Sequence, residues 1–157
     1  MPQLVKGGKH VFAWTLVGQV GEIRIPPEAL AEYKLRHQAQ LYLMPASRTS
    51  GGFVVGERGR ILDSPIGSLI NAHHELRSCR VPEGESILLG SNRYCWVTLR
   101  EGCIVVPTST LRFYDVYAGS RLLAVRGSGL AISHIVRGPI VEEAKKHPEI
   151  EVFSTES

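Results

Sequence analysis

The chain has 157 residues, 43% hydrophobic and 21% charged, which is typical of a globular domain with an ordinary core and excludes wholesale disorder. Its apolar runs are too short to cross a bilayer and no signal-peptide pattern is present, so we expect a cytoplasmic protein without a membrane partner. The net charge of +3 is compatible with nucleic-acid binding without requiring it: residues 1–78 and 79–141 each have an excess of three positive charges, and residues 142–157 an excess of three negative charges.

The first half of the chain is predicted to form two hairpins separated by a short helix. The aromatic and β-branched segment HVFAWTLV is typical of a strand. A turn that ends at Gly21 leads to the short strand EIRIP, which stops at Pro26 because proline donates no ladder hydrogen bond. About two helical turns follow, with Leu30 and Tyr33 on one face, and the segments QLYLM and GFVV form the second hairpin.

A longer amphipathic helix is predicted after the second hairpin, in the segment SPIGSLINAHHEL. Ser64 is its expected N-cap and Pro65 lies in its first turn. Its core-facing side is formed by Ile66, Leu69, Ile70 and His73. The segment RSCRVPEGES that follows is the expected linker.

The second half of the chain repeats the first at an offset of 81 residues. Residues 21–47 can be laid on residues 102–128 without a gap. The identical pairs are Gly21/Gly102, Ile23/Ile104, Pro26/Pro107, Leu30/Leu111, Tyr33/Tyr114, Leu41/Leu122 and Ser47/Ser128. A second trailing helix is predicted in GPIVEEAKKH. We therefore divide the chain into residues 1–78, a first unit with its trailing helix, and residues 79–157, a second unit with its helix and an acidic tail.

The repeated unit predicts how the two halves assemble. A hairpin–helix–hairpin of about 45 residues buries too little surface to be stable alone, and its unpaired strand edges need a partner. Two units in one chain supply that partner to each other. We predict a mainly β fold with short helices, in which the two hairpin–helix–hairpin repeats intertwine as an intramolecular pseudo-dimeric barrel, each followed by an amphipathic helix.

The order strand, turn, G-x-[IV]-x-[IV]-P, short helix and aliphatic hairpin resembles the AbrB/SpoVT-type swapped-hairpin domain, in a tandem, MraZ-like arrangement. The resemblance covers roughly residues 9–55 and 91–134. It implies a swapped-hairpin barrel and a prokaryotic DNA-binding transcriptional regulator that is dimeric or larger. Such domains usually carry a basic residue directly after the turn glycine, where this chain has Glu22 and Cys103, and one or two arginines in the short helix, where only Arg112 matches.

Five arginines on or beside the predicted hairpins and short helices are the candidate DNA-binding residues. They are Arg24, Arg36, Arg100, Arg112 and Arg121. As a group they could bind phosphate, whereas any single one of them is better explained as part of an ordinary solvated surface. Arg58, Arg60 and Arg137 fall in predicted turns, where they could bind phosphate or cap loop carbonyls.

Other constellations favour structural roles. The cluster His73, His74, Glu75 and Cys79 fits no zinc-ligand spacing, so no metal is expected. The aromatic pairs Phe12/Tyr94, Trp14/Trp96 and Tyr33/Tyr114 are expected in the core. The three cysteines are expected to be reduced thiols. No catalytic motif and no cofactor-binding motif is present, so we expect a protein that is not an enzyme.

The sequence leaves three functions open. The first is a DNA-binding transcriptional regulator of the AbrB/SpoVT type that forms a homo-oligomer and binds double-stranded DNA. The alternative is a protein-interaction or effector-binding module that keeps the barrel and has lost the DNA-binding face, as Glu22 and Cys103 suggest; the effector is unknown. A remote third is a barrel enzyme that cleaves itself at a Gly-Ser bond to make its own cofactor, although turn chemistry explains every Gly-Ser pair.

Overall fold

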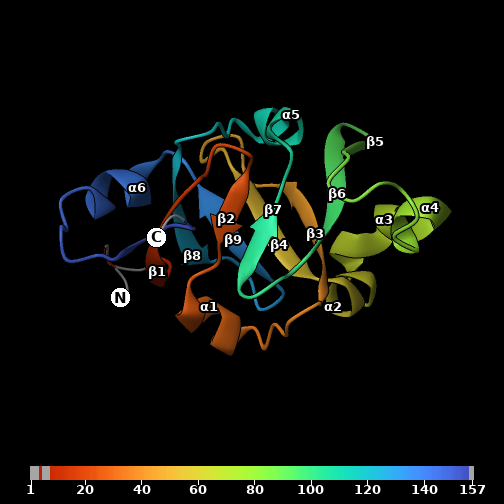
Figure 1. Ribbon diagram of the computed structural model, residues 1–157, viewed down its shortest axis with the longest axis horizontal. Helices are drawn as coiled ribbons and strands as arrows, with labels where there is room; N and C mark the ends of the chain where they lie inside the picture. The colour runs from red at the N-terminus through yellow and green to blue at the C-terminus, as the bar shows by residue number, and fades with distance from the viewer. Residues whose placement is uncertain (1–3, 5–7, 156–157) are drawn as a thin grey trace.

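Two β-sheets form most of the fold in the computed structural model, which describes Leu4 and residues 8–155 (Figure 1). The strands are β1 (Val11–Leu16), β2 (Glu22–Arg24), β3 (Gln40–Pro45), β4 (Phe53–Glu57), β5 (Ile87–Leu89), β6 (Asn92–Thr98), β7 (Cys103–Val105), β8 (Arg121–Arg126), β9 (Ala131–Ile135) and β10 (Val152–Phe153). The α-helices are α1 (Pro27–Glu32), α2 (Arg58–Leu62), α3 (Ser68–Ala72), α4 (His74–Arg77), α5 (Thr108–Leu111) and α6 (Pro139–Ala144). Two 3₁₀ turns, η1 (Pro65–Gly67) and η2 (Arg112–Tyr114), precede α3 and follow α5. The predicted class, mainly β with short helices, is confirmed.

The large sheet is open. Its eight strands lie in the order β10-β1-β8-β9-β4-β3-β6-β5, so β10 and β5 form its two edges. The remaining strands, β2 and β7, pair only with each other and make a separate two-stranded ribbon that crosses in front of the large sheet (Figure 1). The predicted closed barrel is therefore wrong. The short β5 and β10 add to the two ends of the sheet and leave it unclosed.

Strands from the two halves of the chain pair with each other at several places, in addition to the pairs β3·β4, β5·β6 and β8·β9 within one half. On the large sheet β1 pairs with β8 and β3 pairs with β6, with Trp14 opposite Leu123 and Trp96 opposite Tyr42. At the centre of the same sheet β4 pairs with β9. The predicted hairpin between the first two strands is wrong, since β2 forms its ladder with β7, where Ile23 lies opposite Ile104.

The main hydrophobic core lies between the ribbon and the inner face of the large sheet. Alternation along each ribbon strand turns Ile23 and Ile104 inward, where both are fully buried, and leaves Arg24 and Val105 exposed. Two smaller cores lie under α6 and under α2 to α4, at opposite ends of the molecule (Figure 1). The aromatic pairs are buried as predicted, except that Trp96 is half-buried.

The predicted amphipathic helix after the second hairpin is broken into three pieces. The break between α3 and α4 falls at His73, which has an extended backbone (φ −104°, ψ 96°) and whose Nδ1 accepts the Leu76 N–H at 3.1 Å as the N-cap of α4. Ile70 is buried, but Ile66 and Leu69 are 46% and 47% exposed. The segment therefore does not form the single straight helix that would bury all three on one side, and the cap at His73 starts α4 as a separate helix.

Candidate anion-binding site

Two of the five candidate arginines lie beside the ribbon. Arg24 projects from β2 with its guanidinium 5.4 Å from the centre of the Phe153 ring. Arg100 follows β6 at the end of the ribbon, where its backbone bridges to Cys103, and its side chain forms an ion pair with Glu83 at 3.1 Å. The Glu83 carboxylate therefore neutralises Arg100, and Arg24 is the free charge of the pair.

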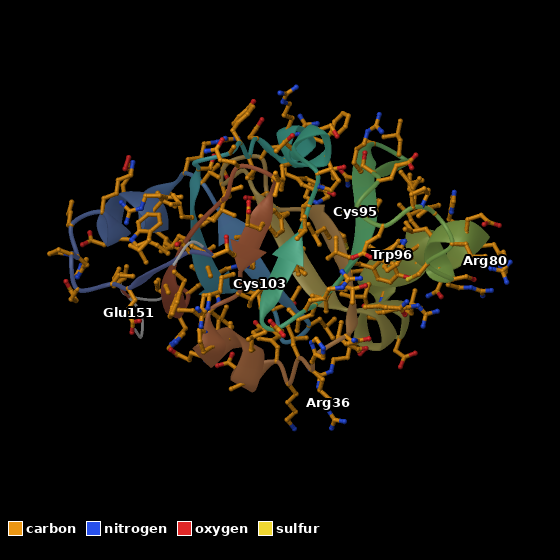
Figure 2. All side chains as sticks on the ribbon, viewed as in Figure 1. Arg36, Arg80, Cys95, Trp96, Cys103 and Glu151 are labelled. Carbon is orange, nitrogen blue, oxygen red and sulfur yellow. The ribbon has the colours of Figure 1, made fainter. Side chains whose placement is uncertain are left out.

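The other three arginines lie in three separate hollows. Arg36 is exposed in the loop between α1 and β3, at the rim of the molecule (Figure 2). Arg112 lies in η2, in a different hollow. Arg121 begins β8 and packs over the Trp14 ring at 4.6 Å, in a third. The structure does not gather the five arginines into one continuous surface.

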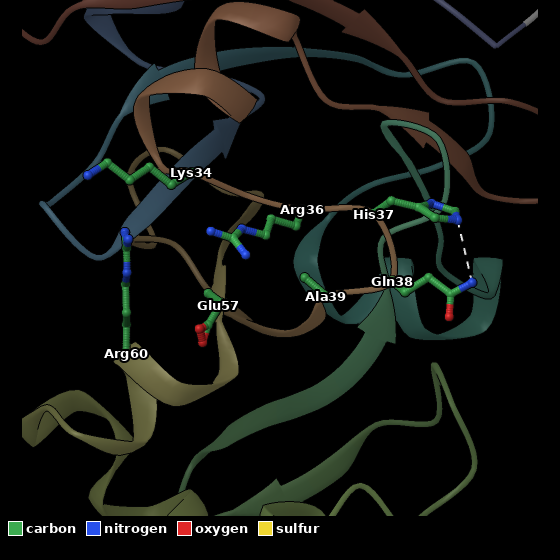
Figure 3. A pocket seen from close by; sticks show the side chains of 7 residues that line it. All are labelled: Lys34, Arg36, His37, Gln38, Ala39, Glu57 and Arg60. Atoms are coloured by element: carbon green, nitrogen blue, oxygen red, sulfur yellow. Dashed lines mark hydrogen bonds between the residues drawn. The ribbon is translucent and has the colours of Figure 1, made fainter.

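Around Arg36, however, it gathers other cations that were not among the five. A cavity of about 400 Å³ opens between α2 and the segment 33–39, which we call the basic loop (Figure 3). The cavity is lined by Lys34, Arg36, His37, Gln38, Ala39, Glu57 and Arg60. Figure 3 shows the three long cationic side chains on one side of it, with His37 and Gln38 on the other.

The basic loop is anchored at both of its ends by hydrogen bonds. Tyr33 ends α1, is 4% exposed, and its hydroxyl donates to the Ser128 carbonyl at 2.7 Å. At the other end the Gln38 N–H donates to the Leu99 carbonyl at 2.6 Å. Between these anchors Lys34 and Gln38 adopt left-handed conformations, with φ of 52° and 71°. Non-glycine residues rarely adopt this region, and such strain concentrates at functional sites.

The electrostatics of the cavity favour an anion. Its one carboxylate, Glu57, is the N-cap of α2 and accepts the Gly59 N–H at 2.6 Å. Arg60 donates through Nη1 to the Tyr33 carbonyl at 3.1 Å, which holds its guanidinium at the cavity. Within residues 4 and 8–155, neither Lys34 nor Arg36 forms an ion pair with a carboxylate. Three positive charges thus face one carboxylate that is already hydrogen-bonded.

His37 adds a hydrogen-bonding ring to the cavity. Its Nδ1 accepts the Glu101 N–H at 3.1 Å, so this nitrogen carries no proton in the structure. Its Nε2 lies 3.4 Å from Nε2 of Gln38 (Figure 3). The ring therefore ties the basic loop to the turn that leads into β7.

The segment 114–120, which we call the aromatic loop, has the same backbone with different side chains. Asp115 and Gly119 have φ of 61° and 85°, and the Gly119 N–H donates to the Val17 carbonyl at 2.8 Å, as Gln38 does to Leu99. Where the basic loop has Lys34 and Arg36, the aromatic loop has Asp115 and Tyr117. The cationic cavity is thus a property of one half of the molecule.

Sequence reasoning missed Lys34 and took Arg60 for a turn residue. The missed signal is the segment KLRH, in which two positive side chains and a histidine fall within four residues. Arg60 could not be found in this way, because it lies on α2, 24 positions after Arg36 in the sequence. Two other turn arginines do cap carbonyls as expected: Arg58 donates to the Arg77 carbonyl at 2.9 Å, and Arg137 to that of Arg48 at 2.8 Å.

The remaining candidate sites have structural roles. His73 caps α4 and His74 contacts Arg77 at 3.2 Å. Among the residues that the structure describes, no three His, Cys, Asp or Glu side chains are placed to hold a metal ion. All three cysteines are free thiols.

Comparison of the chain with family models, curated proteins and solved structures found no match. Over the described ranges, no helix has both the length and the apolar character needed to span a membrane.

Proposed function

We propose that this protein is a DNA-binding transcriptional regulator of the AbrB/SpoVT type, and that the basic cavity contacts the phosphate backbone of double-stranded DNA. The observation that carries the proposal is the convergence of Lys34, Arg36 and Arg60 on one cavity whose single carboxylate is occupied. Phosphate neutralisation by lysine and arginine supplies most of the affinity of a protein for DNA.

The strand pairing supports the proposed scaffold. On the large sheet, adding or subtracting 81 residues converts the pair β1·β8 into the pair β6·β3. The paired residues Phe53 and His134 on this sheet, and Ile23 and Ile104 on the ribbon, are each 81 residues apart. This is the pairing expected if two copies of one unit are related by a pseudo-two-fold axis. We infer that the chain is a tandem swapped-hairpin domain, left open by the extra edge strands, and that the regulator acts as a homo-oligomer.

Unlike a symmetric contact, the proposed DNA contact does not use the two ribbon positions that follow the turn glycines. Glu22 occupies the position after the turn glycine and accepts the Val20 N–H through Oε1 at 3.1 Å, so it serves the turn. The corresponding Cys103 is uncharged, and burial raises its pKa. An acidic and a neutral residue there would give no attraction for phosphate. We therefore assign the contact to the basic cavity, with Arg24, Arg112 and Arg121 as further phosphate ligands.

The test is the salt dependence of DNA binding. Fluorescence anisotropy with a labelled duplex of about 30 base pairs should give an affinity that falls with salt, and K34A/R36A/R60A should lower the slope of log K against log salt by about 2 to 3. The matched control is K145A/K146A, which removes two cations from the α6 end, where they pair with Glu142 and Glu143. Absence of binding at low salt, or an equal loss in the control, would contradict the proposal.

A second function is favoured by the volume of the cavity. About 400 Å³ lies in the range of small-ligand pockets, so the cavity could hold a phosphate-bearing effector such as a nucleoside triphosphate. Isothermal titration calorimetry with ATP, pyrophosphate and inorganic phosphate separates the two functions. Binding of a nucleotide that is lost in K34A/R36A/R60A, without duplex binding, would identify an effector-binding module.

A further inference from the structure

The end of the molecule that carries α5 exposes large apolar side chains. Phe113 and Tyr117 are each 54% exposed, and Val20 is 66% exposed. Tyr117 lines a hollow of about 330 Å³ together with Gln19, the neighbour of Val20, and Arg112, the neighbour of Phe113. Phe113 lines a second hollow, of about 280 Å³, together with Asp115 and Arg137, so that the consecutive residues Arg112 and Phe113 belong to one hollow each. We call these two hollows, with Val20 and Arg93, the aromatic end.

The fold does not require apolar residues at these places. At an offset of 81 the corresponding residues are Glu32 for Phe113, Arg36 for Tyr117 and Glu101 for Val20, all exposed and all charged. The two loops share their backbone hydrogen bonds, so the same scaffold accepts charge at each position. Two charged positions of the first half and one of the second are thus apolar in the other copy. Exposed apolar groups that gather in one region of a surface mark interaction sites.

The aromatic end also has a positive charge that the residues around it do not neutralise. Arg93 lies over the Phe113 ring with its guanidinium 4.1 Å from the ring centre. Neither Arg93 nor Arg112 forms an ion pair with a carboxylate in the described part of the chain, and the nearby Asp115 is paired with Arg137 at 3.0 Å. Arg93 is half-buried and also donates to Ser86 Oγ at 3.4 Å, whereas Arg112 is exposed. The one carboxylate beside Val20, that of Glu22, accepts the Val20 N–H at 3.1 Å. The surface therefore combines apolar area with the guanidinium groups of Arg93 and Arg112.

We propose that the aromatic end docks an acidic amphipathic peptide segment of another protein. Its carboxylates would pair with Arg93 and Arg112, and its aliphatic or aromatic side chains would cover Val20, Phe113 and Tyr117. A single-stranded nucleic acid fits less well, because Arg93 already occupies one face of Phe113 and a base gains nothing from Val20. This inference uses no residue of the basic cavity and shares only Arg112 with the proposed DNA contact.

The test is peptide selection on the full chain. A phage-displayed library of random peptides is panned on the protein and counter-selected on F113E/Y117R, which introduces the side-chain types that Glu32 and Arg36 place on the same backbone. We expect enriched peptides with net negative charge and at least two large apolar residues. A fluorescein-labelled copy of one should bind F113E/Y117R at least about tenfold more weakly, and R112E more weakly than R112A. K145A/K146A should bind it like the parent protein.

Three results would overturn the proposal. Enriched peptides without acidic bias, or with equal affinity for F113E/Y117R, would show that the aromatic end is not the acidic-peptide site. Light scattering that finds an oligomer for the parent and a monomer for F113E/Y117R would identify a second copy of this chain as the occupant. Binding of oligo(dT) that F113E/Y117R loses would assign the surface to nucleic acid. The circular dichroism spectrum of F113E/Y117R should match that of the parent, which separates loss of binding from loss of fold.

Discussion

The basic loop and the aromatic loop are two versions of one backbone with opposite surface chemistry. Each loop starts at a buried tyrosine, Tyr33 or Tyr114. In each, the N–H two residues beyond the tyrosine donates to a carbonyl of the preceding helix: Leu35 to Leu30 at 3.0 Å, and Val116 to Leu111 at 3.1 Å. The exposed positions between these anchors are basic in one loop and acidic, aromatic or small in the other.

The difference separates what the fold requires from what it permits. The buried tyrosine, the aliphatic residue two positions later and the two left-handed positions are common to both loops, so they carry the structure. The exposed positions contact little and are free to diverge. The exposed side chains that differ between the loops are therefore better indicators of function than the shared ones. Substitutions at matched positions test whether structure and function divide in this way.

The largest effect on the free energy of unfolding should come from the buried tyrosines that both loops share. Tyr33→Ala and Tyr114→Ala each remove a buried ring and a hydrogen bond, to the Ser128 carbonyl at 2.7 Å and the Arg93 carbonyl at 3.0 Å. Each should lower the free energy of unfolding by about 3 to 5 kcal/mol, measured by urea denaturation with tryptophan fluorescence. Tyr117→Ala is the control and should change it by less than about 0.5 kcal/mol. A comparable loss in Tyr117→Ala would mean that the exposed ring also carries structure.

A smaller effect on stability is expected at the core position where one half has Phe53 and the other has His134. Phe53 and His134 are corresponding, paired residues with stacked rings 4.9 Å apart, and neither His134 ring nitrogen has a hydrogen-bond partner among the described residues. Burial lowers the pKa of His134 to about 4, below its ordinary value of 6.5. Between these values the unfolded chain binds the proton more readily, so stability is kept above pH 6.5 and lost as the pH falls towards 4.

His134→Phe should remove up to about 3 kcal/mol of this acid destabilisation, seen by comparing urea denaturation at pH 7 with that near pH 4. The swapped variant F53H/H134F, which moves the imidazole across the same pair, should regain the acid sensitivity. Parallel pH dependence in His134→Phe and the parent would show that other groups govern acid unfolding.

These comparisons also show what the sequence could predict. Gly21 and Gly102, the two prolines after the short strands, and the buried tyrosines are local signals, and the short strands and helices they mark lie close to where they were expected. Barrel closure was mispredicted because it depends on edge pairing: β10 joins β1 in parallel through backbone groups, as at Trp14/Val152, which no side-chain pattern specifies. The cavity was missed in part because Arg60 reaches it only through tertiary packing of α2.

The smallest effect should come from exchanging the left-handed residues Gln38 and Gly119. A Cβ built on Gly119 meets no atom within 4 Å, so only its φ of 85° opposes a side chain, and Gly119→Gln should cost about 1 kcal/mol. Gln38→Gly relieves the same strain but frees the unfolded chain, so a gain of a few tenths of a kcal/mol is expected. Gly129→Ala, equally open but not left-handed, is the control and should stay within about 0.5 kcal/mol. A clear loss of stability in Gln38→Gly would mean that the Gln38 side chain itself holds the basic loop, and the strain at Gln38 would then belong to the cavity rather than to the shared scaffold.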